Sequence, residues 1–256
     1  MISIAIKAKD SLRREGPVRT ARKVLAYPLN RMRLQRFAKR VLILPSTEER
    51  FTAIYNINYW NSDESISGRG STLKFTENLR KELPKLLSAF SIKEIFDAPC
   101  GDFNWMKHLL PLVDVNYIGG DIVLPLIESN SKKYAASRIA FYHIDLTKDV
   151  FPQADLMICR DCLVHLSYSD TKSVLKNFVA SGIPFLLTTT HKNSGGSFSN
   201  KDIPTGGYRF IDLFSAPYNF PRNPLSTIDD WSPPEPERQM CLWSREQVAS
   251  ALSSFN

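Results

Sequence analysis

The fold is decided by residues 94–106, which read EIFDAPCGDFNWM. Glu94 to Phe96 are predicted to form a short buried strand that ends at Asp97. Beyond a polar turn, apolar residues recur at helical spacing from Phe103 to Val113. The stretch therefore predicts a strand, a tight turn and a helix.

The same unit recurs along the chain. Further strands are predicted at Tyr117–Gly119, Ile139–Ile144, Leu156–Cys159, Phe185–Thr188 and Met240–Trp243, with helical patterns between most of them. Repeated strand-helix units imply an α/β protein with a mostly parallel sheet and helices on both faces. Because crossovers are right-handed, the carboxyl ends of the parallel strands meet at one edge, where ligands bind.

Length and composition fit one large domain. The chain has 256 residues, of which 43% are hydrophobic, as expected for a protein with a sizeable core. The first apolar run is too short for a signal peptide, and no segment has the roughly 18 to 20 apolar residues that cross a bilayer. We therefore expect a cytoplasmic protein.

The positive charge is concentrated at the amino terminus. Residues 1–50 contain 13 Lys and Arg against 4 Asp and Glu, whereas the remainder is slightly acidic. We predict a basic helical extension over residues 1–50 and a catalytic domain over 51–256. The extension fits amphipathic helices packed on the domain, or docking on an anionic membrane surface peripheral to the inner face of the membrane. Nucleic-acid contact is disfavoured because aromatic residues are sparse and no recognition motif is present.

The cysteines predict neither a disulfide framework nor a metal site. Four cysteines in a chain of this length are too few for a disulfide scaffold. Cys159 and Cys162 have the spacing of half a zinc site, but no second pair accompanies them. We predict no metal.

Acidic residues follow the first four predicted strands in turn: Asp97, Asp121, Asp145 and Asp161. One Asp after a strand is a common helix cap, but four would converge on one crevice. Asp121 lies 20 residues beyond Gly101, the separation at which a carboxylate binds both ribose hydroxyls. The turn has Gly101 as its one glycine, whereas a dinucleotide pyrophosphate needs a glycine-rich turn. A cationic nucleoside such as S-adenosylmethionine fits these carboxylates better.

Four motifs resemble those of a group of bacterial class I S-adenosylmethionine-dependent methyltransferases with a Rossmann-like fold. They are ESISGRGST (64–72), DAPCGDFNWM (97–106), YIGGDI (117–122) and ADLMICRDCLVHL (154–166). The likeness covers about residues 50–245, and the chain departs from the broader class by having Pro99 and Cys100 where a glycine is usual. It implies a seven-stranded sheet, S-adenosylmethionine as the cofactor, and a sugar or glycoconjugate hydroxyl as the acceptor.

The resemblance also implies the cofactor contacts. The methionine end is expected against the first turn, which consists of Asp97, Ala98, Pro99, Cys100, Gly101 and Asp102. Asp121 and Ile122 are expected at the ribose, Asp145 and Leu146 at the adenine, and Arg160 beside them. Asp145 alternatively caps its own turn.

A hydroxyl acceptor needs a base, and His165 is the first candidate. It lies four residues after Asp161, so both face one side of the crevice if they share a helical turn. Asp161 would then orient His165 or bind the acceptor, and His191 is the reserve base. Alternatively, His165 packs under a loop and Asp161 forms a structural ion pair with Arg160.

Segments outside the sheet are expected to shape the acceptor pocket. They are Tyr59 and Trp60, the loop 67–71, and the excursion 192–239, which is too long to be structureless in a compact domain. Two other functions stay open. A non-catalytic module that binds S-adenosylmethionine would share the first motifs, and a nucleic-acid methyltransferase would explain the basic amino terminus but lacks a base-stacking motif after the fourth strand.

Overall fold

The computed structural model describes residues 36–255. The chain divides into two compact units between Leu44 and Pro45. In the first unit, residues 36–41 are helical, and residues 1–35 of the predicted basic extension lie outside the described residues. The second unit begins at Pro45, and its first helix, α3 (Thr47–Asn56), crosses the boundary that was predicted between residues 50 and 51.

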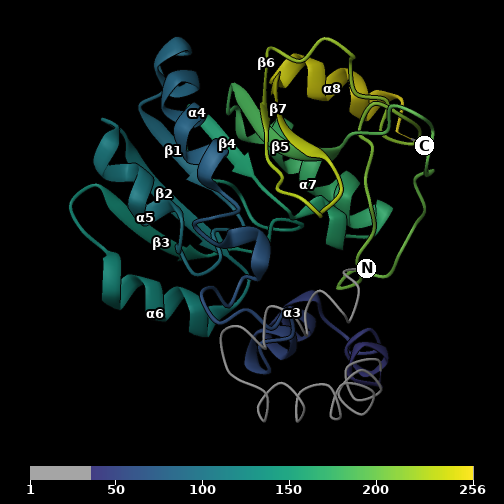
Figure 1. Ribbon diagram of the computed structural model, residues 1–256, viewed down its shortest axis with the longest axis horizontal. Helices are drawn as coiled ribbons and strands as arrows, with labels where there is room; N and C mark the ends of the chain where they lie inside the picture. The colour runs from purple at the N-terminus through teal and green to yellow at the C-terminus, as the bar shows by residue number, and fades with distance from the viewer. Residues whose placement is uncertain (1–35, 256) are drawn as a thin grey trace. The chain divides into compact units, whose positions relative to one another are not determined.

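The larger unit is built on a seven-stranded sheet with the strand order β3-β2-β1-β4-β5-β7-β6 (Figure 1). The first five strands are parallel, and β7 is antiparallel to both β5 and β6, so the sheet is mixed. The strands are β1 (Glu94–Asp97), β2 (Asn116–Asp121), β3 (Ile139–His143), β4 (Leu156–Cys159), β5 (Phe185–His191), β6 (Ser226–Asp229) and β7 (Arg238–Ser244).

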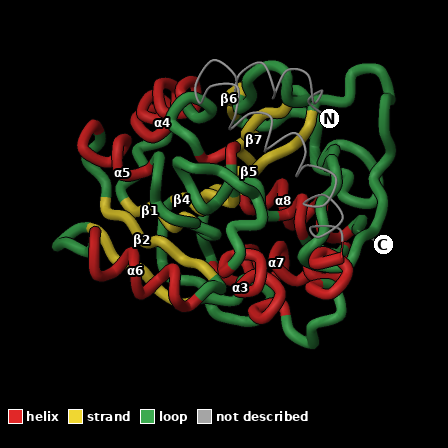
Figure 2. The backbone as a smooth tube through the Cα atoms, turned by 60° about the horizontal axis from the view of Figure 1, so that its bottom comes forward, coloured by secondary structure: helices red, strands yellow, loops and turns green. Residues whose placement is uncertain are grey.

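Helices cover both faces of the sheet, as predicted (Figure 2). One face packs against α4 (Glu77–Ala89), α5 (Met106–Leu109) and α6 (Leu124–Tyr134), and the other against α7 (Tyr168–Ser181) and α8 (Arg245–Ser253). Short 3₁₀ turns lie at η1 (Arg69–Ser71), η2 (Leu110–Leu112) and η3 (Leu163–His165).

Successive residues of the central strands enter opposite cores. Ile95 belongs to the core beneath α4 and α5, and Phe96 to the core beneath α7 and α8. In β7, Leu242 belongs to the core beneath α4 and α5, and Trp243 to the core beneath α7 and α8. Because side chains alternate along a strand, a sheet buried on both faces needs continuous apolar runs, which explains why these strands were visible in the sequence.

Strand register brings the predicted polar residues to one edge. Asp97 pairs with Gly119, so β2 extends two residues further, to Asp121. At the far side, the antiparallel pairing places His191 at the end of β5 opposite Arg238 at the start of β7.

One prediction about local structure is wrong, and for a second segment the structure adds detail. The helix predicted over Phe103–Val113 is reduced to α5 and η2, because Phe103 has a left-handed φ of 58° and Pro111 has no amide hydrogen to donate. The excursion 192–239 contains strand β6 and the first residues of β7, and its residues 211–220 contribute buried side chains to the core. Only part of it can therefore face a substrate.

Among the helices within residues 36–255, none combines the length and the apolar character needed to cross a membrane.

Candidate functional site

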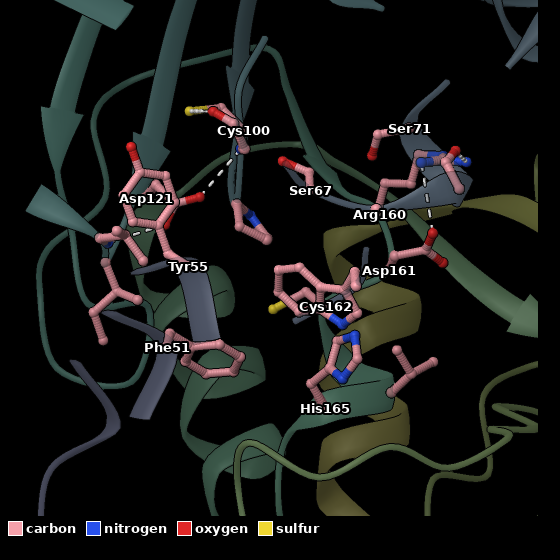
Figure 3. Close-up of a pocket in the computed structure, with 18 of the residues that line it drawn as sticks. Phe51, Tyr55, Ser67, Ser71, Cys100, Asp121, Arg160, Asp161, Cys162 and His165 are labelled. Atoms are coloured by element: carbon pink, nitrogen blue, oxygen red, sulfur yellow. Dashed lines mark hydrogen bonds and ion pairs between the residues drawn. The ribbon is translucent and has the colours of Figure 1, made fainter. Parts of the chain in front are cut away.

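A cavity of about 590 Å³ opens at the carboxyl edge of the parallel strands (Figure 3). Its walls come from α3, from the loop 66–71, from the ends of β1, β2, β4 and β5, and from the start of β7. This volume is typical of a small-molecule site. The crossover geometry thus places the cavity where the sequence predicted a ligand.

The turn after β1 approaches its neighbours as closely as a glycine allows. Gly101 has a left-handed φ of 55°, and a Cβ atom there would lie 2.3 Å from Ser67 Oγ. Its amide donates to Asp121 Oδ2 at 3.1 Å, while Asp121 Oδ1 accepts from the amide of Val123 at 3.0 Å. These bonds hold the first turn against the end of β2 at the cavity wall.

Two buried carboxyls lie at this end of the cavity. Asp97 is 2% exposed and accepts from Tyr117 Oη at 2.8 Å. Burial raises the pKa of Asp97 to about 7, against the opposing effects of Tyr117 and Arg160. Burial likewise raises the pKa of Asp121 to about 6, although backbone amides favour its charged form. A cationic ligand placed here would lower both pKa values and so favour the ionised form of both groups.

Asp102 and Ala98 do not line the cavity. Asp102 accepts from Ser65 Oγ at 2.9 Å and from the amide of Ile66 at 2.9 Å, and its own amide donates to Ser67 Oγ at 3.0 Å. The expected cofactor contact of Asp102 is thus replaced by a structural role, which is to fasten the loop before η1 to the first turn.

Ile122, Asp145 and Leu146 line the cavity beyond Asp121. The Asp145 carboxylate accepts from Thr147 Oγ1 at 2.7 Å and from Lys148 Nζ at 2.6 Å. Burial acts to raise the pKa of Asp145, but these hydrogen bonds outweigh it and hold the pKa below its ordinary value. Asp145 therefore caps its own turn and borders the cavity at the same time.

A buried network of four charges forms one wall. Arg160 Nε and Nη2 donate to the two Asp230 carboxylate oxygens at 2.9 and 3.0 Å, and Nη2 also donates to the Gly70 carbonyl at 2.7 Å. Asp161 pairs with Arg238 at 2.9 Å and with Arg160 at 3.5 Å. The guanidinium of Arg160 is committed to this network, and Arg160 also lines the cavity, so its contact with a cofactor stays a prediction.

The predicted pairing of Asp161 with His165 is wrong. Asp161 has a left-handed φ of 52° and its amide donates to Thr189 Oγ1, so the helical turn starts only at Leu163. His165 Nδ1 instead lies 2.7 Å from the carbonyl oxygen of Gly207. The partner that orients His165 is therefore a backbone carbonyl.

This contact determines the tautomer of His165. A carbonyl oxygen can only accept, so neutral His165 has its proton on Nδ1 and a free lone pair on Nε2. Burial lowers the pKa of His165 from its ordinary value, which keeps the ring neutral at pH 7. Its ring lies 5.8 Å from that of Trp60 and 5.6 Å from that of Tyr208. In neutral His165, Nε2 is therefore the ring atom that can accept a proton.

His191 has the opposite tautomer. The amide of Ile211 donates to His191 Nδ1 at 3.2 Å, so the neutral ring has its proton on Nε2. Burial, with a contribution from Arg238, lowers the pKa of His191 to about 4. With its one lone pair already occupied, His191 is not suited to be the reserve base.

The sequence predictions missed several residues of the site. Arg238 enters it because β7 runs antiparallel to β5, a direction that apolar patterning does not reveal, and Asp230, which follows β6, supports it as an ion-pair partner. Phe51 and Tyr55 enter it from α3. The signal for α3 was present in the sequence, since Ser46 and Glu49 have capping-box spacing and form both of its hydrogen bonds.

No protein-family model matches the chain, and no curated protein matches it. Solved structures do resemble it. A methyltransferase from Leishmania major that depends on S-adenosylmethionine has a TM-score of 0.57 and 12% identity over 77% of this chain and 85% of its own. Magnesium protoporphyrin IX methyltransferase from Synechocystis PCC 6803, with bound S-adenosylhomocysteine, has a TM-score of 0.54 and 12% identity over 78% and 100%.

A third similar structure is the 1,6-didemethyltoxoflavin-N1-methyltransferase of Burkholderia thailandensis, with bound 1,6-didemethyltoxoflavin and S-adenosylhomocysteine. Its TM-score is 0.54, with 14% identity over 77% of this chain and 86% of its own. The strand order and the cavity define a Rossmann-like α/β protein with a ligand site at the carboxyl edge. Within that class, the chain has the fold of the class I S-adenosylmethionine-dependent methyltransferases.

Proposed function

We propose that the protein is an S-adenosylmethionine-dependent methyltransferase. The observation that carries this proposal is the pair of buried carboxyls, Asp97 and Asp121, on either side of Gly101 at one end of the cavity. S-adenosylmethionine has an ammonium and a sulfonium, so it matches buried carboxyls that lack a paired cation at this end. A pyrophosphate at the same place would meet negative charge.

The residues present fit the whole cofactor. Asp97 and the first turn would hold the ammonium, and Asp121 would accept from the ribose hydroxyls with its remaining lone pairs. Ile122, Leu126 and Leu146 offer an apolar wall for the adenine. When bound, S-adenosylmethionine supplies an electrophilic methyl group.

We propose further that the acceptor is a hydroxyl group and that His165 is its general base. His165 Nε2 takes the hydroxyl proton, and the Gly207 carbonyl stabilises the imidazolium through Nδ1. Trp60 and Tyr208 flank the ring and offer flat apolar surfaces to a sugar. Together with the sequence resemblance, this supports a sugar or glycoconjugate acceptor.

Calorimetry tests the cofactor assignment. S-adenosylmethionine and S-adenosylhomocysteine should bind at about −7 to −8 kcal/mol, whereas NAD⁺ should not bind. Asp121→Ala should weaken binding by about 1.5 to 3 kcal/mol through loss of the ribose hydrogen bonds. Asp114→Ala is the matched control, because Asp114 is exposed and pairs with Lys93 and Arg138 away from the cavity. Unchanged affinity in a folded Asp121→Ala protein contradicts the ribose assignment.

A further inference from the structure

A series of aromatic rings leads outward from His165. The ring of Tyr208 lies 5.6 Å from His165, the ring of Phe210 lies 6.0 Å from Tyr208, and the ring of Phe198 lies 5.7 Å from Phe210. His191 contacts Phe210 at 4.9 Å. We call Phe198, Tyr208 and Phe210 the aromatic strip.

The aromatic strip joins two hollows. Tyr208 lines the cavity described above, and Phe198 and Phe210 line a second, more open hollow. Tyr208 is 56% exposed and Phe210 is 39% exposed. Adjacent large aromatic side chains left open beside a ligand cavity are typical of a binding surface rather than of ordinary protein surface.

Arg209 anchors two of the three rings of the strip, those of its chain neighbours Tyr208 and Phe210. The Arg209 side chain is buried, and its guanidinium donates to the carbonyls of Leu163 and Leu166 and to Tyr218 Oη. The backbone amide of Arg209 also donates to the Val164 carbonyl at 3.0 Å. Because Arg209 points inward, its neighbours Tyr208 and Phe210 project outward. A surface fixed in this way loses little entropy when it binds a ligand.

The chemistry of the second hollow favours an uncharged polar ligand. Besides the two Phe rings, the described residues around it are Gly196, Ser197, Ser199, Lys201 and Arg209. Lys201 is exposed, whereas the Arg209 guanidinium is occupied by the carbonyls beneath it. Among the described residues around this hollow, Lys201 is the one cation left without these partners, and a nucleic-acid backbone binds through several phosphate contacts.

Sugar rings match this surface, because they present apolar C–H faces to aromatic rings and hydroxyls to serines and backbone groups. We propose that the aromatic strip binds the sugar units next to the one that is methylated, so that the acceptor is an oligosaccharide chain rather than a monosaccharide. The inference rests on the proposed function, because it places the methylated unit against His165. The remaining units then follow Tyr208 out to Phe210 and Phe198.

Ligand-observed NMR with neutral gluco- and manno-oligosaccharides, from mono- to hexasaccharides, tests the proposal on the full chain with and without S-adenosylhomocysteine. In the wild type, affinity should rise with chain length. Phe210→Ala and, separately, Phe198→Ala should each weaken the longer ligands about three- to tenfold and leave monosaccharide binding unchanged. Tyr142→Ala is the control, because Tyr142 is 52% exposed but lies on β3 and lines neither hollow.

Three results overturn the proposal. The first is a chain-length dependence that survives in both folded Phe variants. The second is an absence of binding by every oligosaccharide at about 10 mM. The third is that the wild type binds neutral phosphatidylcholine vesicles instead of sugars and that the Phe variants lose this vesicle binding. Calorimetry with S-adenosylhomocysteine on the same samples separates the two claims. If that ligand fails to bind, the proposed function fails, whereas unaltered oligosaccharide binding in the Phe variants contradicts the aromatic strip alone.

Discussion

Binding of S-adenosylmethionine should weaken by about eightfold when the pH falls from about 7.5 to about 6, because Asp97 takes up a proton. Burial raises the pKa of Asp97 to about 7, so the empty site is largely protonated at the lower pH. A cationic ligand binds the carboxylate form, and the proton must leave first. Asp121, with a pKa of about 6, adds about a further factor of two over the same range.

Calorimetry at several pH values, in buffers of different ionisation enthalpy, measures both the affinity and the proton released. Asp97→Asn removes the titrating group, and its pH dependence should shrink to the approximately twofold effect of Asp121. Asp145→Asn is the matched control, because the pKa of Asp145 is lowered and this group does not titrate near neutrality.

A second ligand isolates the part of the cofactor involved. 5′-Methylthioadenosine has the nucleoside but neither the α-amino group nor the sulfonium. Its affinity should therefore not fall with pH as Asp97 becomes protonated. If the wild type and Asp97→Asn show the same pH dependence with S-adenosylmethionine, then Asp97 does not meet the cation and the reasoning is refuted.

The stability of the unliganded protein gives an independent measurement on the same carboxyl. Because the folded pKa of Asp97 is raised, the folded protein keeps a proton between about pH 4 and about 7 that the unfolded chain has lost. In that window the contribution of Asp97 to the unfolding free energy falls by about 1.4 kcal/mol per pH unit as the pH rises. Asp97→Asn should therefore melt higher than the wild type at pH 8. Equal melting temperatures there would contradict a buried charge at Asp97.

Three further predictions address the turn, the histidines and the amino terminus. Gly101→Ala should lower stability by at least about 1 kcal/mol and abolish cofactor binding, whereas Gly195→Ala, which meets no atom within 4 Å, should do neither. Long-range nitrogen NMR should find neutral His165 protonated on Nδ1 and neutral His191 on Nε2; the same tautomer in both would be contrary evidence. If residues 1–44 dock on an anionic membrane, vesicle binding should rise with acidic lipid and fall with salt, whereas equal binding to neutral vesicles argues for helices packed on the domain. Deletion of residues 1–40 should preserve cofactor binding.

The parallel strands, and the edge of the sheet at which the cavity opens, were predictable from the sequence. Strands buried on both faces have to be continuously apolar, so their ends can be located by the first polar residue. Parallel strands with right-handed crossovers bring those ends to one edge whatever the loops do. Asp97, Gly101 and Asp121 lie at one edge for this reason, and the structure adds a hydrogen bond from the Gly101 amide to Asp121.

The acceptor end was decided by the tertiary structure, because its contacts join segments whose relative direction no local pattern encodes. The reversal of β7 delivers Arg238 to Asp161, and the left-handed backbone of Asp161 leaves it outside the turn that contains His165. The histidine tautomers depend on single backbone groups, the Gly207 carbonyl and the Ile211 amide, which belong to an irregular segment about 20 to 40 residues away in the chain. Periodicity identifies which residues are buried, whereas a hydrogen bond to a distant loop exists only once the whole chain has packed.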